Sequence, residues 1–250
     1  IAYSSVSHMG YVVMGLFALE PVAIEGANLQ LINHGLSSAG LFAMVGMLYE
    51  RFHTRSIQSL GGIAKKAPWL TTLFMLFTFS SIGLPGLNGF VGEFLILTGS
   101  FQRAWTGVSP DFQQSYLFFS LMGLVGIVLG AWYMLWAVER VFFGNSRLPP
   151  SYSINEAQNS LDLRWHEIAA LSPLAIFILW IGIIPAIFLA PPSQSIRVMT
   201  YASSNAFNRN MQPTKISFGT EMITEKNKVN SQIDLPEIFL TSQKQSPVKQ

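Results

Sequence analysis

The stretch Gly83-Leu-Pro-Gly-Leu-Asn-Gly89 interrupts an apolar segment that extends from Trp69 to Phe101. As one helix this segment of about 33 residues would measure roughly 50 Å, too long for a straight crossing of a hydrocarbon layer of about 30 Å. Glycine frees the backbone, and proline lacks the N–H that a helix needs. We therefore expect a discontinuous helix. The residues expected to form the break are Gly83, Pro85, Gly86 and Gly89, and Asn88 is expected to satisfy backbone groups that the break exposes.

Glu93 follows the break within the same apolar segment. A charged side chain inside a bilayer costs about 2.5–3.5 kcal/mol on insertion scales, so such a residue is a candidate for function. A helix that restarts near Gly89 would place Glu93 in its first turn or so, where the helix dipole stabilises the anion, whereas desolvation favours the protonated acid. These opposed effects suit a group that gains and loses a proton. The alternative is a structural carboxylate permanently paired with a cation.

The composition predicts an integral membrane chain. Half of the residues are hydrophobic and 11% are charged, against about 25% charged residues in globular domains. The net charge of +2 is too small to indicate a nucleic-acid partner. Because the chain has no cysteine, it cannot hold a disulfide, a thiolate zinc site or an iron–sulfur cluster. No His or carboxylate spacing suggests another metal site, so we expect no metal and no cofactor on this chain.

Five apolar segments indicate an all-α fold, because backbone polar groups in lipid must be satisfied within each segment. The expected membrane helices are Ala2–Leu19, Val22–Tyr49, Trp69–Phe101 with its break, Tyr116–Phe143 and Trp165–Ala190. We expect residues 1–191 to form a transmembrane domain. Residues 192–250 are polar and receive no fold. The chain starts with Ile rather than Met and shows no signal peptide, and we interpret it as a fragment.

The distribution of Lys and Arg predicts the orientation of the chain. Loops 51–68 and 144–164 hold or adjoin most of the basic residues outside the tail. Short cytoplasmic loops carry the excess of positive charge. We therefore place both loops in the cytoplasm or its topological equivalent.

The second segment carries a polar stripe, because Gln30, His34, Ser37 and Ser38 share one face of an otherwise apolar helix. One interpretation is a proton or water path with His34 as a titratable stop. The other is hydrogen bonding between helices, worth about 0.6 kcal/mol per contact in membranes. The spacing alone leaves both open.

The first segment carries a weaker polar stripe, formed by Ser4, His8 and Tyr11. We also assign Ser7 to the polar residues that would support the proton path. For His8, the residue pattern alone favours a solvated or capping histidine.

Four blocks of sequence resemble the antiporter-like subunit M of respiratory NADH–quinone oxidoreductase (complex I), the bacterial counterpart of mitochondrial subunit 4. They are Ile1-Ala-Tyr-Ser-Ser-Val-Ser-His-Met-Gly10, His34-Gly-Leu-Ser-Ser-Ala-Gly-Leu-Phe42, Leu48-Tyr-Glu-Arg-Phe-His-Thr-Arg55 and Gly83-Leu-Pro-Gly-Leu-Asn-Gly-Phe-Val-Gly-Glu-Phe94. The resemblance covers about residues 1–190. The third block is more specific than the first two, which cation/proton antiporter subunits share.

The resemblance implies a proton-pumping membrane-arm subunit built on two inverted five-helix repeats, of which this chain would carry most of the second repeat and the final helix. Glu93 is similar to the essential acid on the broken helix, and His34 and His8 resemble the two histidines of the central polar axis. NADH, FMN, iron–sulfur clusters and quinone would be bound by partner subunits. The resemblance also implies other membrane-arm subunits and the lipid bilayer as partners.

We expect a multi-pass protein of the bacterial inner (plasma) membrane, with an organellar inner membrane as the alternative. One rival function is a component of a multisubunit sodium/proton antiporter. The other is a non-pumping structural fragment.

Overall fold

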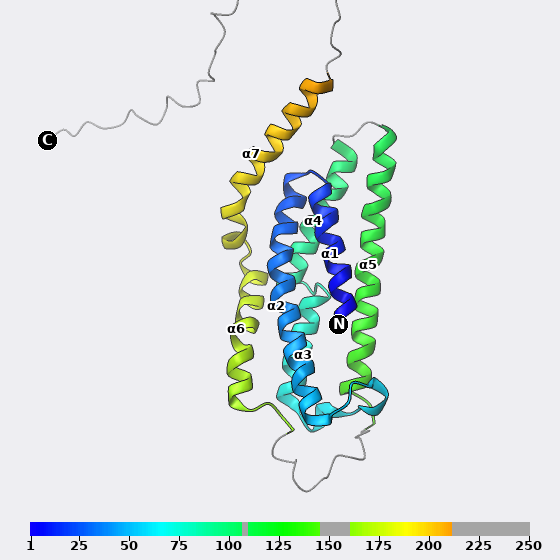
Figure 1. Cartoon of the computed structure of the whole chain (residues 1–250), viewed down its shortest axis with the longest axis vertical. Coiled ribbons are helices and arrows are strands. Elements are labelled where there is room, and N and C mark those ends of the chain that lie inside the picture. Colours follow the sequence, from blue (N-terminus) through cyan, green and yellow to red (C-terminus); the bar gives the residue numbers. More distant parts are fainter. Residues whose placement is uncertain (107–109, 146–160, 212–250) are drawn as a thin grey trace, which may run out of the picture. The chain divides into compact units, whose positions relative to one another are not determined.

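The computed structural model describes residues 1–106, 110–145 and 161–211. The chain divides into two units, Ile1–Phe207 and Asn208–Gln250, and the candidate site belongs to the first. The described residues contain seven α-helices and two short 3-10 helices (Figure 1). They are α1 (Ala2–Phe17), α2 (Pro21–Phe52), η1 (Ile57–Ser59), η2 (Ile63–Lys65), α3 (Pro68–Ser81), α4 (Asn88–Thr106), α5 (Pro110–Phe142), α6 (Trp165–Ile183) and α7 (Ala186–Met211). The all-α fold is therefore confirmed for these residues.

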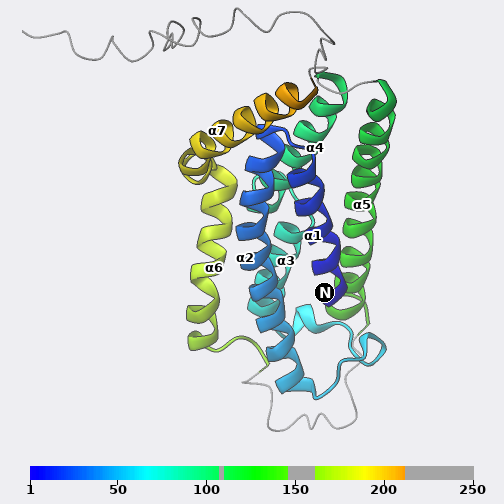
Figure 2. The ribbon, with the colours of Figure 1, turned by 45° about the horizontal axis from the view of Figure 1, so that its top comes forward.

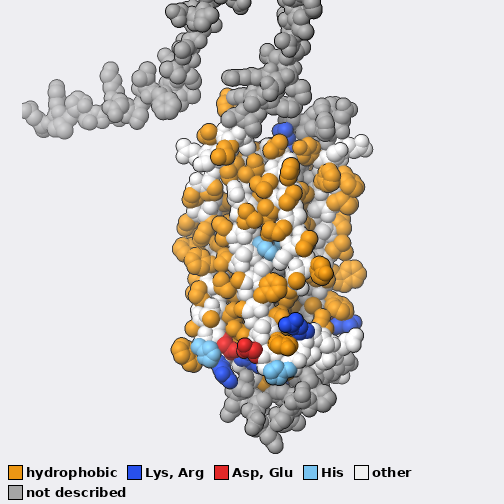
Figure 3. All heavy atoms as spheres, viewed as in Figure 1, with side chains coloured by type: hydrophobic (Ala, Val, Ile, Leu, Met, Phe, Trp, Pro, Cys, Tyr) orange, Lys and Arg blue, Asp and Glu red, His pale blue; other side chains and the backbone are white. Residues whose placement is uncertain are grey.

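Three stretches of the described residues are long and apolar enough to cross a membrane: Pro21–Phe52, Gln113–Phe142 and Trp165–Ile183. Apolar side chains cover the middle of the face seen in Figure 3, and charged side chains gather near its lower end. On α5, Val128 and Trp132 are 62% and 69% exposed. Such continuous apolar exposure is unusual in soluble monomers. The chain is an integral membrane protein.

The most extensive helix contact joins α2 and α4, and α1 and α5 also pack on α4 (Figure 2). Small residues allow the first contact. A Cβ atom at Gly26 of α2 would lie 2.8 Å from the backbone nitrogen of Ile96 on α4. Close backbone approach of this kind is the usual basis of helix packing in membranes. Residue Glu93 of α4 therefore faces a tightly fitted α2.

At one end of the first unit, the start of α6 is tied to the end of α2 and the start of α3. The Arg51 guanidinium forms a 2.5 Å ion pair with the Glu167 carboxylate. The Asp162 carboxylate accepts hydrogen bonds from the backbone N–H groups of Trp69 (3.1 Å) and Leu70 (2.9 Å). These donors are unsatisfied within a helix, so an acid here caps α3. The described parts of both basic loops thus lie at the same end, and the side of the membrane stays a prediction.

We expect Arg51→Met to lower the melting temperature of the purified protein and its amount in the membrane. The side chains of Arg51 and Glu167 are 10% and 12% exposed, and removal of one partner of a buried pair costs about 3–5 kcal/mol because the other charge stays unpaired. Thermal denaturation of the purified protein measures the effect. Arg55→Met is the control, because Arg55 is exposed and stacks on Tyr49. Equal melting temperatures for the two variants would contradict the prediction.

The predicted helices differ from the structure near the end of the described chain. We expected one helix over Trp165–Ala190, whereas α6 ends at Ile183 and α7 starts at Ala186. We expected no helix after Pro191 and Pro192, but α7 includes both prolines and continues to Met211. Proline disturbs a helix without always ending it, because neighbouring groups can compensate for the missing N–H. Residues 212–250 of the predicted tail lie outside the described residues, and the division at residue 191 stays a prediction.

Candidate functional site

The break between α3 and α4 is a compact turn that starts with a glycine in a left-handed conformation. Gly83 has a φ of +71°. Its N–H donates to the Ser80 carbonyl (3.4 Å), and the N–H of Leu84 donates to the Phe79 carbonyl (3.0 Å). This pair of bonds is the Schellman motif, which satisfies the last carbonyls of a helix. The break predicted between these two half-helices is therefore present.

The glycines of the break also allow close approach. A Cβ atom at Gly83 would lie 2.5 Å from Oε2 of Glu93. At Gly89 a Cβ atom would collide with the Ser80 carbonyl. The ends of α3 and α4 therefore fit together only because these two positions lack side chains, and the turn leaves room for the carboxylate. Helix α6 packs closely against the break, since a Cβ atom at Gly182 would lie 2.5 Å from the Cα of Leu87.

Glu93 lies in the second turn of α4, because the helix starts at Asn88 and its first turn holds no acidic residue. The restart expected near Gly89 is found one residue earlier, and Glu93 lies just past the first turn. The dipole effect falls off within the first turn, so neighbouring side chains are the main groups that can stabilise the Glu93 anion.

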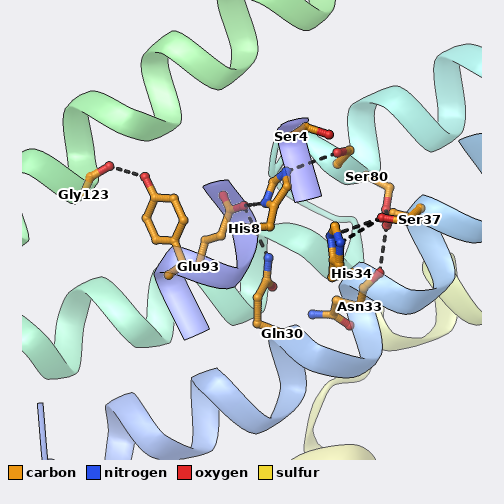
Figure 4. Close-up of polar contacts among 12 residues, drawn as sticks. Ser4, His8, Gln30, Asn33, His34, Ser37, Ser80, Glu93 and Gly123 are labelled. Atoms are coloured by element: carbon orange, nitrogen blue, oxygen red, sulfur yellow. Dashed lines mark hydrogen bonds and ion pairs between the residues drawn. The ribbon is translucent and has the colours of Figure 1, made fainter. Parts of the chain in front are cut away.

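Side chains from two other helices, His8 and Gln30, meet at Glu93, which is 4% exposed (Figure 4). His8 Nδ1 of α1 lies 3.2 Å from Oε1 of Glu93. The Gln30 side-chain amide of α2 donates to the same oxygen at 3.4 Å. On the other side of the imidazole, the hydroxyl of Ser81 lies 3.3 Å from His8 Nε2. Both ring nitrogens of His8 therefore have a polar neighbour at hydrogen-bond distance.

The contact between His8 and Glu93 has the distance of an ion pair, but Nδ1 of His8 has no partner with hydrogen-bond geometry. A hydrogen bond weakens steeply away from a linear arrangement. A small rotation of either side chain is thus enough to make or break the bond, and proton transfer needs that bond.

His34 extends the polar group along α2. Its ring centroid lies 5.3 Å from that of His8, with the ring planes tilted by 33°. The hydroxyl of Ser38 lies 3.1 Å from Nε2 of His34. The two histidine rings are thus neighbours, which the sequence pattern alone could not show. A proton path from Ser38 through His34 to His8 and Glu93 stays a prediction.

The other predicted path residues are less directly placed. The Tyr11 hydroxyl donates to the Gly123 carbonyl of α5, and the Ser4 hydroxyl donates to the Ile1 carbonyl at 2.5 Å. Ser7 is exposed. Ser7 and Tyr11 nevertheless line a cavity of about 10 Å³ together with His8, Ser81 and Glu93, enough for about one water molecule. Their part in a proton path stays a prediction.

Sequence reasoning missed three buried polar residues next to the site: Asn33, Ser80 and Ser81. Asn33 lies on α2 beside His34, and the serines end α3. Each is at most 8% exposed. A count of polar residues inside the apolar segments would have found them, since buried polar groups in lipid are usually functional or bonded to each other.

The arrangement offers one carboxylate and two imidazoles in apolar surroundings, which suits the transfer of protons. Within the described ranges, no group of three His, Cys, Asp or Glu side chains comes together as a metal site. A broken helix beside a buried acid in a membrane bundle is the arrangement found at the ion sites of secondary transporters.

Residues 1–112 match the family described as NADH:quinone oxidoreductase/Mrp antiporter, TM. Over these residues the chain resembles that family. It is 40% identical over 189 residues to NADH-ubiquinone oxidoreductase chain 4 of Marchantia polymorpha, with 76% of this chain and 34% of the relative covered. It is 38% identical over 205 residues to NADH-quinone oxidoreductase subunit M of Rhodobacter capsulatus, with 80% and 36% covered. The resemblance to subunit M is confirmed, and the chain spans roughly a third of the length of these relatives.

Solved structures show the same fold. A chain of respiratory complex I from Thermus thermophilus with bound NADH superposes with a TM-score of 0.61 at 28% identity, covering 78% of this chain and 38% of that one. A chain of the Mrp complex from Dietzia sp. DQ12-45-1b superposes with a TM-score of 0.63 at 20% identity, covering 80% and 43%. The second likeness concerns the fold alone.

Proposed function

We propose that this chain is part of a proton-translocating membrane subunit of NADH–quinone oxidoreductase. The observation that supports it most is the placement of His8 Nδ1 3.2 Å from Oε1 of the buried Glu93. NADH oxidation and quinone reduction would take place on partner subunits that carry FMN and iron–sulfur clusters. This chain would supply groups whose proton affinity changes with the electrostatic state of the complex.

In this proposal His34 and His8 relay a proton and Glu93 loads and releases it. A proton on Nδ1 of His8 passes to Oε1 of Glu93 and leaves a neutral imidazole, which takes up the next proton at a ring nitrogen. The neutral acid then turns away and releases its proton toward the other side. Ser38 and Ser81 orient the two rings, and a water molecule in the small cavity can extend the path.

The finer architecture follows from the same family. We propose five membrane spans, formed by α1, α2, the broken pair α3 and α4, α5 and α6. They would correspond to the second inverted repeat and the final helix of an antiporter-like subunit. The neighbours would be other membrane-arm subunits and lipid, in a bacterial inner membrane or an organellar inner membrane.

A sodium/proton antiporter subunit is the second candidate, because the matched family includes Mrp antiporters. The named relatives that we compared by sequence are both NADH–quinone or NADH–ubiquinone oxidoreductase subunits, and this favours the first proposal. A non-pumping structural role is the third candidate.

Purification of the complex through a tag on this chain distinguishes these functions. We expect the purified complex to contain flavin and iron–sulfur clusters and to reduce quinone with NADH. A flavin-free assembly that exchanges sodium for protons in vesicles would contradict the proposal. An active complex that pumps normally without this chain would indicate a structural role.

We expect His8→Gln to reduce proton pumping more than His34→Gln, because His8 touches Glu93 directly and His34 acts through His8. Loss of a positioned acid–base group typically costs 10²- to 10⁴-fold in rate, about the range expected for His8. Proton uptake by vesicles per NADH oxidised measures the effect. His53→Gln, on an exposed histidine after α2, is the control. Equal defects at all three positions would refute the order of the path.

A further inference from the structure

We propose that Asn33 of α2 and Ser80 of α3 are positioning residues that hold the helix break against α2 and so keep Glu93 beside His8. The inference deepens the proposed function and rests on the role given there to Glu93. It starts from a group of four buried side chains on three helices, called here the break network. Its members are Asn33, Ser37, Ser80 and Asn88.

The break network joins both ends of the break to α2. Ser80 lies in the last turn of α3, and Asn88 is the first residue of α4. Asn33 and Ser37 are one turn apart on α2 and point toward the break (Figure 4). Ser80 and Asn88 are fully buried, and Asn33 and Ser37 are 1% and 3% exposed. Polar groups buried to this extent are expensive unless they bond to each other.

Hydrogen bonds close the network into a ring. The Asn33 side-chain amide donates to the Asn88 carbonyl at 2.7 Å, and the Asn88 amide donates back to the Asn33 carbonyl at 3.4 Å. The Ser80 hydroxyl donates to Oδ1 of Asn88 at 2.5 Å. The hydroxyls of Ser37 and Ser80 are 2.6 Å apart. The Ser37 hydroxyl also donates to the Asn33 carbonyl at 2.9 Å, which closes the ring. Because Ser80 gives its one proton to Asn88, the single proton of Ser37 goes either to that carbonyl or to Ser80.

The Schellman bonds fix the end of α3, but the turn contains two glycines that leave the direction of α4 adjustable. Gly83 and Gly86 have φ values of +71° and +93°, and glycine has a wide choice of backbone conformations. The network supplies the missing constraint by holding Ser80 and Asn88 to each other and to Asn33. Glu93 follows Asn88 by five residues on the same helix. A shift of the start of α4 therefore moves the carboxylate.

The same constraint sets the contacts of Glu93. Gln30, which donates to the carboxylate at 3.4 Å, lies one turn before Asn33 on α2. The start of α4 is thus held to α2 at two positions, by the network at Asn88 and by Gln30 at Glu93. Loss of the network is expected to alter the 3.2 Å separation of His8 and Glu93 without unfolding the bundle, because single hydrogen bonds between membrane helices are weak.

The test uses Ser80→Ala and Asn33→Leu in the assembled complex. The readouts are the infrared carboxyl band of Glu93, assigned by its absence in Glu93→Gln, and proton uptake per NADH oxidised. We expect the band to shift at equilibrium and pumping to fall roughly tenfold, since small displacements of reacting groups are costly. Assembly should stay normal. Ser80→Thr, which keeps the hydroxyl, should restore both readouts.

Thr78→Val is the matched control. Thr78 lies on the same helix, is fully buried, and its hydroxyl has no hydrogen-bond partner among the described residues. We expect this variant to leave the band and pumping unchanged. An unmoved Glu93 band in both Ser80→Ala and Asn33→Leu would overturn the inference, and so would a Ser80→Thr variant as defective as Ser80→Ala. Loss of assembly in Ser80→Ala would also overturn it, because the hydroxyl would then be needed for folding.

The infrared band of Glu93 is measured at equilibrium, without NADH oxidation. The positioning role of the break network and the pumping role of Glu93 can therefore be refuted independently. A shifted band in Ser80→Ala together with normal pumping in Glu93→Gln would support positioning and refute the pumping role of Glu93.

Discussion

Glu93→Gln should abolish most quinone-linked proton pumping while the complex still assembles. Glutamine has nearly the shape of glutamate and keeps a hydrogen-bond acceptor for Gln30, but it cannot take a proton from His8. Removal of a positioned proton-transfer group costs at least about 10²-fold in that step. Proton uptake per NADH oxidised in vesicles measures the loss, and the yield of purified complex measures assembly.

The control for Glu93→Gln is Glu139→Gln. Glu139 is an exposed acid near the end of α5, so the same change in charge should leave pumping intact. Normal pumping by an assembled Glu93→Gln complex would refute the role of the acid. A complex that does not assemble would instead favour the alternative of a structural carboxylate.

Gly89→Val should prevent assembly of the complex. A Cβ atom at this position would collide with the Ser80 carbonyl at the end of α3, so the two half-helices would have to separate. Overpacking typically costs about 1–3 kcal/mol, and here the displaced groups are backbone atoms and members of the buried break network. Native gel analysis of the membrane fraction gives the amount of assembled complex.

Gly35→Ala is the control for this change. Gly35 lies on α2, and a Cβ atom there would have no neighbour within 4 Å. Alanine is also the better helix former, by about 1 kcal/mol. This variant should assemble at least as well as the wild type. Normal amounts of complex with Gly89→Val would show that the break tolerates a side chain and that its geometry is not the determinant we infer.

The helix break and the candidate acid Glu93 could be predicted from the sequence because both depend only on residues close together in the chain. Glycines at 83 and 86 and a proline at 85 stop a helix wherever it packs, and a glutamate within an apolar segment stands out by composition. The helix positions of Gln30, His34 and Ser38 followed from the period of the helix. These predictions needed no knowledge of neighbouring helices.

The contacts between helices could not be predicted in this way. His8 looked like a solvated or capping residue, and only the packing of α1 against α2 and α4 brings it to Glu93. The continuation of α7 beyond Pro192 shows the same limit, since composition does not exclude a helix that neighbouring residues support.

The central claim is that Glu93 changes its protonation state as the complex turns over. Redox-induced infrared difference spectroscopy of the assembled complex tests it most directly, with Glu93→Gln to assign the carboxyl band. We predict a band of the protonated Glu93 carboxyl that rises and falls between the oxidised and NADH-reduced states and is missing in Glu93→Gln. A Glu93 band of constant intensity in both states, in a complex that pumps protons, would contradict the account.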